Sequence, residues 1–415
     1  MPYSKAHQRL AEKFMFKQSF PKAVAGDALL KLVEFAYTEE EADVVCALSL
    51  TPKRASGVAR KLHRPIGEIK PLLKSLGERV LILHTKALGV NLYAFALLLP
   101  GVYEFQMIRS KNAGSDIEYF RRFAELFEDV YDEFLTYAKP VIKDKDLRFG
   151  RIVAVEKSLE RTTGVLPMAT DKYSEIVERN NSFCIVHACS CRQEKALLGK
   201  DCGRPLDVCA GMGWGADLLI EKGLARRVSR EEFMETKQRA SEAGLIHMVD
   251  NLVDPVQVCS CCTCCCSVMR IIKDYNIPTI IVGSHFEAVI NEASCNGCGK
   301  CARICPMDAI SMTGKGKEKK ARIDYARCIG CGLCIPKCNK TMALALRERP
   351  GHKEPSKNPI AYYAERSMEL TGKNHSLVKS MGLELGSALY NISPIKITGP
   401  KYKPKKIFDN AENPY

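Results

Sequence analysis

The stretch CNGCGKCARICP, residues 295–306, places four cysteines in the spacing C-x2-C-x2-C-x3-C. The same spacing returns in CIGCGLCIPKC, residues 328–338, and chance does not supply it twice. Each run has two glycines between its first and third cysteines: Gly297, Gly299, Gly330 and Gly332. Glycine accepts positive φ and lets backbone N–H groups approach sulfur closely. The two runs therefore predict tight loops wrapped around metal.

Three thiolates at three-residue intervals can hold three irons of one cube, while the fourth reaches a second cube. The two runs are therefore predicted to interlock. Over residues 285–348 the pattern resembles the bacterial two-cluster ferredoxin. The resemblance implies two [4Fe-4S] clusters, one held by Cys295, Cys298, Cys301 and Cys338, the other by Cys328, Cys331, Cys334 and Cys305.

One position departs from the ferredoxin pattern. That family places proline after the fourth cysteine of each run; Pro306 does so, whereas Asn339 follows the second run and Pro336 lies inside it. The second loop is therefore expected to differ in shape. Two zinc knuckles, with four thiolates for each metal, are the alternative interpretation.

Eleven further cysteines lie between residues 184 and 266, and only Cys46 lies outside both groups. An apolar strand predicted at 183–186 leads to Cys189 and Cys191, which period-two alternation would direct to one side. The run CSCCTCCC, residues 259–266, is predicted as a loop. The expected metal ligands are Cys189, Cys191, Cys202, Cys209, Cys259, Cys261, Cys262, Cys264, Cys265 and Cys266.

These thiols exceed the four that a [4Fe-4S] cluster or a zinc ion needs. An additional iron–sulfur cluster, a thiol–disulfide active site and structural zinc all stay open. Adjacent thiols in a polar loop gain little from packing and are prone to oxidation, which favours ligation or catalysis. Cys184 and Cys46 are instead expected to be small buried side chains, and His187 is an outside candidate as a ligand.

Predicted helices and strands alternate around these cysteines, which favours a central α/β domain with its site at strand ends. A helix opened by Ser229 and Glu232 precedes the cysteine run, and a helix and the strand IPTIIVGS follow it. The motif GMGWG, residues 211–215, is a weak nucleotide-loop signal, and close backbone approach to a metal site is the preferred interpretation.

CSCR, residues 189–192, followed by CSCCTCCC and two ferredoxin motifs, is similar to iron–sulfur proteins of anaerobic bacteria described as ferredoxin-type oxidoreductases. The resemblance spans most of the chain. It implies redox work but names no substrate.

Residues 38–97 predict a winged-helix-like fold: three helices, the first opened by a Thr38–Glu41 capping box, then a two-stranded wing. Residues 51–100 hold nine Lys/Arg against two Glu, a net +7 and half of the chain's +14. DNA binding through residues 51–97 is therefore a hypothesis, although Pro71 interrupts the third helix. The cations that could meet phosphates are Lys53, Arg54, Arg60, Lys61, Arg64, Lys70 and Lys74.

Helical spacing of aromatic residues predicts a long helix after residue 115 with a core or dimer seam. Its stripe consists of Phe120, Phe123, Phe127, Val130, Tyr131 and Phe134. A homo-oligomer is therefore one expectation. After residue 349 the composition turns to Pro, Lys and Tyr, which predicts a partly ordered basic tail.

With 415 residues, 46% of them apolar, the chain is expected to fold as an α+β multidomain protein. The predicted parts are a winged-helix-like domain (1–145), a cysteine-rich α/β domain (146–284), a two-cluster ferredoxin domain (285–348) and the tail (349–415). The start of the chain lacks a signal-peptide pattern, and the apolar stretch Val90–Tyr103 is too short to span a bilayer. A reducing cytoplasmic location is expected.

Two functions compete. The first is an electron-transfer protein or oxidoreductase subunit, in which two clusters link a ferredoxin or flavoprotein partner to the central metal site. The second is a redox-sensing transcription regulator whose winged helix binds DNA. Whether the chain is itself an enzyme is left open.

Overall fold

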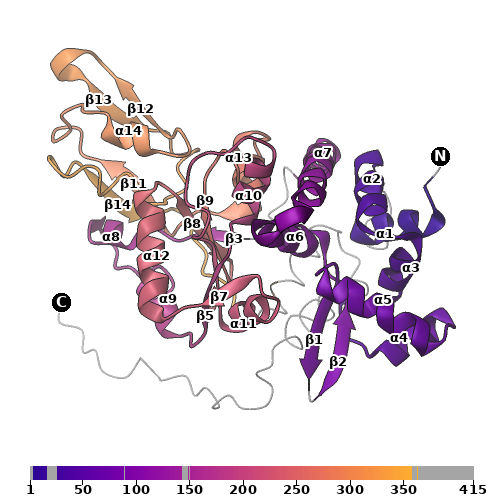
Figure 1. Cartoon of the computed structure of the whole chain (residues 1–415). Helices are drawn as coiled ribbons and strands as arrows, with labels where there is room; N and C mark the ends of the chain where they lie inside the picture. Colours follow the sequence, from indigo (N-terminus) through magenta and orange to yellow (C-terminus); the bar gives the residue numbers. More distant parts are fainter. Residues whose placement is uncertain are drawn as a thin grey trace.

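The computed structural model describes residues 3–15, 26–87, 89–142, 148, 150–357 and 362. Figure 1 shows three neighbouring parts: N-terminal helices, a central sheet, and a segment with α14, β12 and β13 on the far side of that sheet. Of the predicted tail, only residues 349–357 and 362 are among those described. No helix in the described ranges is both long and apolar enough to span a membrane.

The N-terminal part has one helical core. Its elements are α1 (Lys5–Phe14), α2 (Asp27–Ala36), α3 (Glu39–Ala47), α4 (Ala55–Leu62), α5 (Ile66–Glu78), β1 (Leu83–Ala87) and β2 (Val90–Ala94). The Thr38 side chain accepts from the Glu41 N–H and the Glu41 carboxylate accepts from the Thr38 N–H, which fixes the start of α3. From α3 to β2, three helices and an antiparallel hairpin follow the predicted order.

Helix α7 (Ile117–Ile142) follows an irregular turn at Leu98–Val102, helix α6 (Tyr103–Arg109) and two short 3-10 turns, Ser110–Asn112 and Gly114–Asp116. Five residues of the predicted aromatic stripe are buried. Phe134 is 43% exposed, so it lies outside the core of the described residues, and its place in a dimer seam stays a prediction.

The central sheet has seven strands in the order β10-β3-β8-β9-β6-β5-β7. They are β3 (Gly150–Ile152), β5 (Phe183–Val186), β6 (Ala210–Met212), β7 (Ala225–Arg227), β8 (Ile246–Asp250), β9 (Gln257–Cys261) and β10 (Ile281–Val282). Only β10 and β3 run parallel. The predicted mixture of helices and strands is present, but the sheet is mostly antiparallel, because short connections such as β8 to β9 cannot make the long crossover that parallel strands need.

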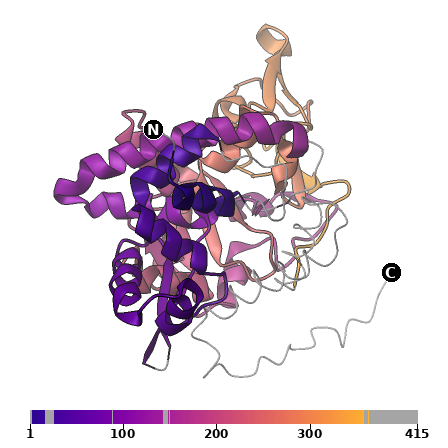
Figure 2. The ribbon, with the colours of Figure 1, turned by 90° about the vertical axis from the view of Figure 1, so that its right-hand side faces the viewer.

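Helices cover both faces of this sheet. One face packs against α9 (Tyr173–Glu178) and α12 (Arg230–Glu242), and the other against α6, α11 (Gly213–Glu221) and α13 (Ser267–Lys273). Helix α10 (Ser190–Leu197) packs against α6 and α7. Figure 2 shows the indigo N-terminal helices on the side nearest the viewer. Strand β7 follows α11 after a short turn, and the predicted strand IPTIIVGS gives a 3-10 turn (Pro278–Ile280) before β10.

The remaining elements surround the two regular cysteine runs. They are α8 (Glu156–Leu159), β4 (Thr162–Thr163), β11 (Phe286–Ile290), α14 (Lys300–Ile304), β12 (Ile310–Thr313), a 3-10 turn (Gly316–Glu318), β13 (Lys320–Ile323) and β14 (Leu344–Glu348). Strand β14 pairs with β11 and also with β4. Strand β4 lies in the chain between strands β3 and β5 of the central sheet, so that segment contributes a strand to this part.

Candidate metal centres

The two regular cysteine runs interlock in the structure. One cavity is lined by Cys295, Cys298 and Cys301 of the first run and by Cys338 of the second. These are the four residues expected to share one cluster, drawn together although Cys338 lies 37 residues beyond Cys301.

The other four cysteines form a second group, and none of them is exposed. Burial, together with nearby Cys305 and Cys328, raises the pKa of Cys331 to about 12. Burial likewise raises the pKa of Cys334, beside Cys331, Cys328 and Cys305. Cys305 of the first run therefore lies with three cysteines of the second, and metal binding here must displace thiol protons.

The glycines of these loops have the positive φ that the sequence predicts. Gly330 has φ 72°, and a Cβ on it would overlap the carbonyl oxygen of Phe286. A Cβ on Gly297, at φ 71°, would overlap the carbonyl oxygen of Lys319. The backbone also donates to sulfur, since the Ala309 N–H lies 3.3 Å from Cys305 Sγ. Such N–H groups stabilise metal-bound thiolates.

Residues 294–342 match the model of the 4Fe-4S dicluster domain. The match covers both cysteine runs and the β12–β13 hairpin between them, so the chain contains an iron–sulfur domain. Neither the curated proteins nor the solved structures gave a match to the chain. The cysteines outside the dicluster domain must therefore be interpreted from their own geometry.

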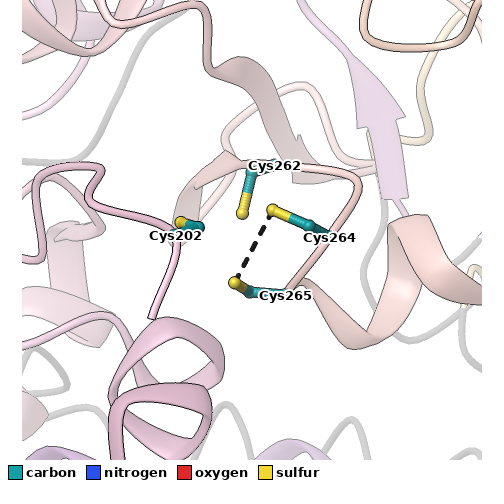
Figure 3. A group of neighbouring side chains, drawn as sticks. All are labelled: Cys202, Cys262, Cys264 and Cys265. Atoms are coloured by element: carbon teal, nitrogen blue, oxygen red, sulfur yellow. Dashed lines mark hydrogen bonds between the residues drawn. The ribbon is translucent and has the colours of Figure 1, made fainter. Parts of the chain in front are cut away.

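Four central cysteines form a compact tetrad (Figure 3): Cys202, Cys262, Cys264 and Cys265. Their sulfurs all lie within 4.8 Å of one another, and the Sγ atoms of Cys264 and Cys265 are 3.7 Å apart. A tetrahedral ion with metal–sulfur bonds of about 2.3 Å separates its ligands by about 3.8 Å. The tetrad thus has the size for a single zinc or iron ion.

One tetrad thiol is already acidic. A hydrogen bond from Cys265, opposed by burial and assisted by the Arg192 guanidinium, lowers the pKa of Cys262 to about 5. Arg204 Nη1 approaches Cys264 Sγ at 3.6 Å. A thiolate and nearby cations favour metal binding at neutral pH.

The other six cysteines form a closed ring of thiols, which we call the thiol ring. Cys189 is hydrogen-bonded to Cys191 and Cys209, and Cys259 to Cys209 and Cys261. Cys266 closes the ring by bonding both Cys191 and Cys261. The prediction grouped Cys202 with Cys189, Cys191, Cys209 and part of the run 259–266. The structure places it with Cys262, Cys264 and Cys265 of that run but apart from the other three, because it lies on the loop between α10 and β6.

Secondary structure explains how the ring is assembled. Cys259 and Cys261 lie two positions apart on β9 and so share one face of the sheet. Cys189 and Cys266 are the N-caps of α10 and α13, and Cys209 directly precedes β6. The run 259–266 is therefore not one loop: it begins in a strand and ends at a helix. Cys191 lies inside α10, not at a strand end as predicted.

Contacts among the ring cysteines shift their pKa values in opposite directions. Donation from Cys189 and Cys266 lowers the pKa of Cys191 well below its usual range, and donation from Cys189 and Cys259 does the same for Cys209. The donors, in turn, have raised pKa values.

Two buried basic side chains, Arg192 and Lys237, lie beside the ring cysteines, and sequence reasoning missed both. Arg192 lies against Cys189, Cys209 and Cys262, and its Nη1 donates to the Ser260 carbonyl at 2.8 Å. Lys237 donates to the Val208 carbonyl at 2.6 Å and to Ser260 Oγ at 3.3 Å. Burial lowers the pKa of Lys237 to about 8, although nearby Cys209 opposes the change. The arginine that follows Cys191 in CSCR was the sequence signal that could have indicated Arg192 as part of the site.

Other predicted candidates lie apart from these sites. Cys184 is fully buried in β5, and burial raises its pKa to about 11, as for a core thiol. His187 is half-buried and is not among the tetrad ligands. In GMGWG, a Cβ on Gly211 would come within 3.1 Å of Cys184 Sγ and Ala216 N, so this glycine allows α11 to pack closely on the sheet.

The predicted DNA-contacting cations are partly engaged within the protein. Arg64 bonds Glu40 and Glu68, and Lys61 donates to the Ala47 carbonyl. Helix α5 carries Pro71, yet continues to Glu78. Pro71 therefore does not end the helix, although the sequence predicted an interruption there.

Proposed function

We propose that this protein is an iron–sulfur electron-transfer protein in which the dicluster domain exchanges electrons with the central cysteine site. The single observation that carries the proposal is a shared apolar cluster. Cys191, Cys259, Cys261 and Cys266 of the thiol ring pack in the same cluster as Cys305, Cys328 and Cys331 of the dicluster domain.

The residues between the two groups are apolar and mostly buried. They include Met307, Ala309 and Leu333 from the dicluster domain, with Ile246 and Met248 from β8. The domain is also joined to the sheet by the backbone, because the Val155 N–H donates to the Cys331 carbonyl at 3.0 Å. These contacts hold the donor and acceptor cysteines in a fixed relation and exclude water between them.

The clusters, when bound, accept and release single electrons at potentials set by burial and by N–H···S bonds. The chain supplies those conditions. The Ala309 N–H donates to Cys305, and burial surrounds Cys331 and Cys334 with apolar side chains. The first group, with exposed Cys298, lies nearest to solvent and is the natural entry point for an electron.

The surface around that entry point is basic. Residues 294–342 hold ten Lys/Arg against three Asp/Glu, a net +7. Exposed Lys300 and Lys337 line the same cavity as Cys295 and Cys338. An acidic ferredoxin or flavoprotein is therefore the proposed redox partner, since complementary charge speeds association.

The DNA-binding alternative has weaker support. On the exposed side of α5, Lys70 and Lys74 are accompanied by Glu68 and Glu78, and Lys74 and Glu78 lie 3.7 Å apart. Such a helix offers little net charge to a phosphate backbone. The hairpin β1–β2 also contacts α11, because Lys222 Nζ donates to the His84 carbonyl.

The test is whether electrons pass through the dicluster domain. Reduced ferredoxin is mixed anaerobically with wild-type protein and with Cys298→Ser, and reduction of the central site is followed by its own absorbance and magnetic signals. We expect the variant to slow that reduction at least about tenfold, because it removes a cluster ligand at the entry point. Unchanged kinetics in a variant that has lost iron would refute the proposal.

A further inference from the structure

The thiol ring and the tetrad differ in how far apart their sulfurs lie. In the part of the chain that the structure describes, the tetrad is the one set of three or more ligand atoms within 4.8 Å of one another. Each ring thiol contacts the two thiols next to it in the ring, but no three ring sulfurs lie within 4.8 Å of one another. The dicluster cysteines also fall outside that limit, because a cubane binds its four thiolates at four separate irons. The ring thiols thus resemble the dicluster cysteines, and differ from the tetrad, in not meeting that limit.

Charge points the same way. Arg192 and Lys237 are 1% and 2% exposed, and both face the ring. A [4Fe-4S]2+ core held by four thiolates has a net charge of about −2, which these two cations would balance. A buried anion without such partners would be strongly unfavourable.

Arg192 also has donors to spare. Its Nε and Nη2 are buried and make no hydrogen bond of good geometry within the described residues. Buried guanidinium donors need acceptors, and the sulfur atoms of an iron–sulfur cluster accept N–H groups. The side chain lies between the ring thiols Cys189 and Cys209 and the tetrad thiol Cys262.

We propose that the thiol ring holds an iron–sulfur cluster of [4Fe-4S] size, separate from a single tetrahedral ion held by the tetrad. The ten central cysteines then serve two sites of different nuclearity. This assignment deepens the proposed function, because it names the group that would exchange electrons with the dicluster domain. Only the electron-transfer role of the ring cluster rests on the proposed function.

The test compares matched double variants of full-length protein purified without oxygen. Cys191→Ser with Cys209→Ser alters the ring, Cys202→Ser with Cys264→Ser alters the tetrad, and Cys46→Ser is the control. Iron, zinc and acid-labile sulfide are measured per chain. Wild type should hold about twelve irons and about twelve sulfides, with one further ion.

The two double variants should lose different metal. The ring variant should lose about four irons and about four sulfides and keep the further ion, whereas the tetrad variant should lose only that ion. Loss of the same metal from both, or full iron in the ring variant, would overturn the inference. A wild-type value of about eight irons would do so as well.

A second pair keeps the inference testable if the ring variant fails to fold. Arg192→Gln removes the buried charge and Arg192→Lys retains it. We expect Arg192→Gln to release the ring iron to a chelator at least about tenfold faster than Arg192→Lys, while the dicluster iron is released equally. Equal release from both variants would contradict the role given to Arg192. If the ring iron is present but the reduced dicluster domain does not pass electrons to it, the proposed function fails and the cluster assignment stands.

Discussion

The dicluster domain and the thiol ring both gather cysteines, but by different means. In the dicluster domain, two short runs turn back on their own sulfurs at glycines with positive φ. In the thiol ring, the sulfurs come from β9, from the residue before β6 and from the first residues of α10 and α13. Local backbone geometry forms the first site, whereas the sheet and two buried cations form the second.

This difference teaches where each site is vulnerable. A change that forbids one backbone conformation should empty part of the dicluster domain and leave the ring loaded. A change in buried charge should weaken the ring and leave the dicluster domain loaded. The predictions below separate these two dependencies.

The largest effect is expected from Gly330→Ala. The new Cβ would overlap the Phe286 carbonyl oxygen at φ 72°, so the loop that carries Cys328 and Cys331 cannot close. We expect loss of about four irons per chain, measured by metal analysis. Gly316→Ala is the matched control, because Gly316 has φ 54° with open space around it and should cost only about 1 kcal/mol. Equal iron in the two variants would show that the loop tolerates the overlap.

Lys237→Met should affect the ring alone. The substitution removes one of two buried cations beside Cys209 and keeps the apolar volume. We expect iron release from the ring to accelerate by about tenfold or more, while the dicluster iron is unaffected. Chelator kinetics followed at two wavelengths distinguish iron release from the ring and iron release from the dicluster domain. Lys340→Met, at an exposed lysine, is the control. Parallel acceleration at both sites would break the proposed distinction.

Charge reversal at the dicluster surface should slow partner docking without removing metal. Lys300→Glu with Lys337→Glu reverses two exposed charges at the cavity of the first cysteine group. We expect reduction by an acidic ferredoxin to slow about fivefold at low salt, with the difference vanishing at high salt. Stopped-flow mixing at several ionic strengths measures it. A salt-independent difference would point to damage to the domain instead.

The smallest effect concerns the turn that positions β9. Buried Asp250 accepts from the backbone N–H groups of Val256 and Gln257, and burial raises its pKa from 3.8 to about 6. Because the folded pKa lies above the unfolded one, protonated Asp250 stabilises the fold, and that stabilisation is lost as pH rises through about 6. Relative to Asp250→Asn, wild type should lose about 1 kcal/mol of unfolding free energy between pH 5 and pH 7.5. Anaerobic thermal unfolding at both pH values measures the gap, and a constant gap would refute it.

The sequence predicted the dicluster domain well because its information is local. Three cysteines of each group lie within seven residues, and only Cys305 and Cys338 exchange partners. The glycines of the two cysteine runs predicted the positive φ angles that the structure shows. Likewise, the Thr38–Glu41 capping box was readable, since its two residues are three positions apart.

The central site was predictable only as a set of thiols. Its division into ring and tetrad depends on contacts such as Cys209 with Cys259 and Cys191 with Cys266, which join residues about 50 to 75 positions apart. Adjacent Cys261 and Cys262 belong to different groups, because β9 ends between them. Spacing alone cannot reveal where a strand stops, so it could not show that Cys202 lies with Cys262, Cys264 and Cys265 and apart from Cys189, Cys191 and Cys209.

The apolar cluster between the ring and the dicluster domain has one more consequence. Water and other mobile dipoles must reorient when charge moves past them, and that reorientation is a large part of the barrier to electron transfer in solution. Met307, Leu333 and Met248 offer few dipoles to reorient. The gap between the two sites should therefore have a low reorganisation energy, and a polar side chain placed there would slow the transfer even with every sulfur in position.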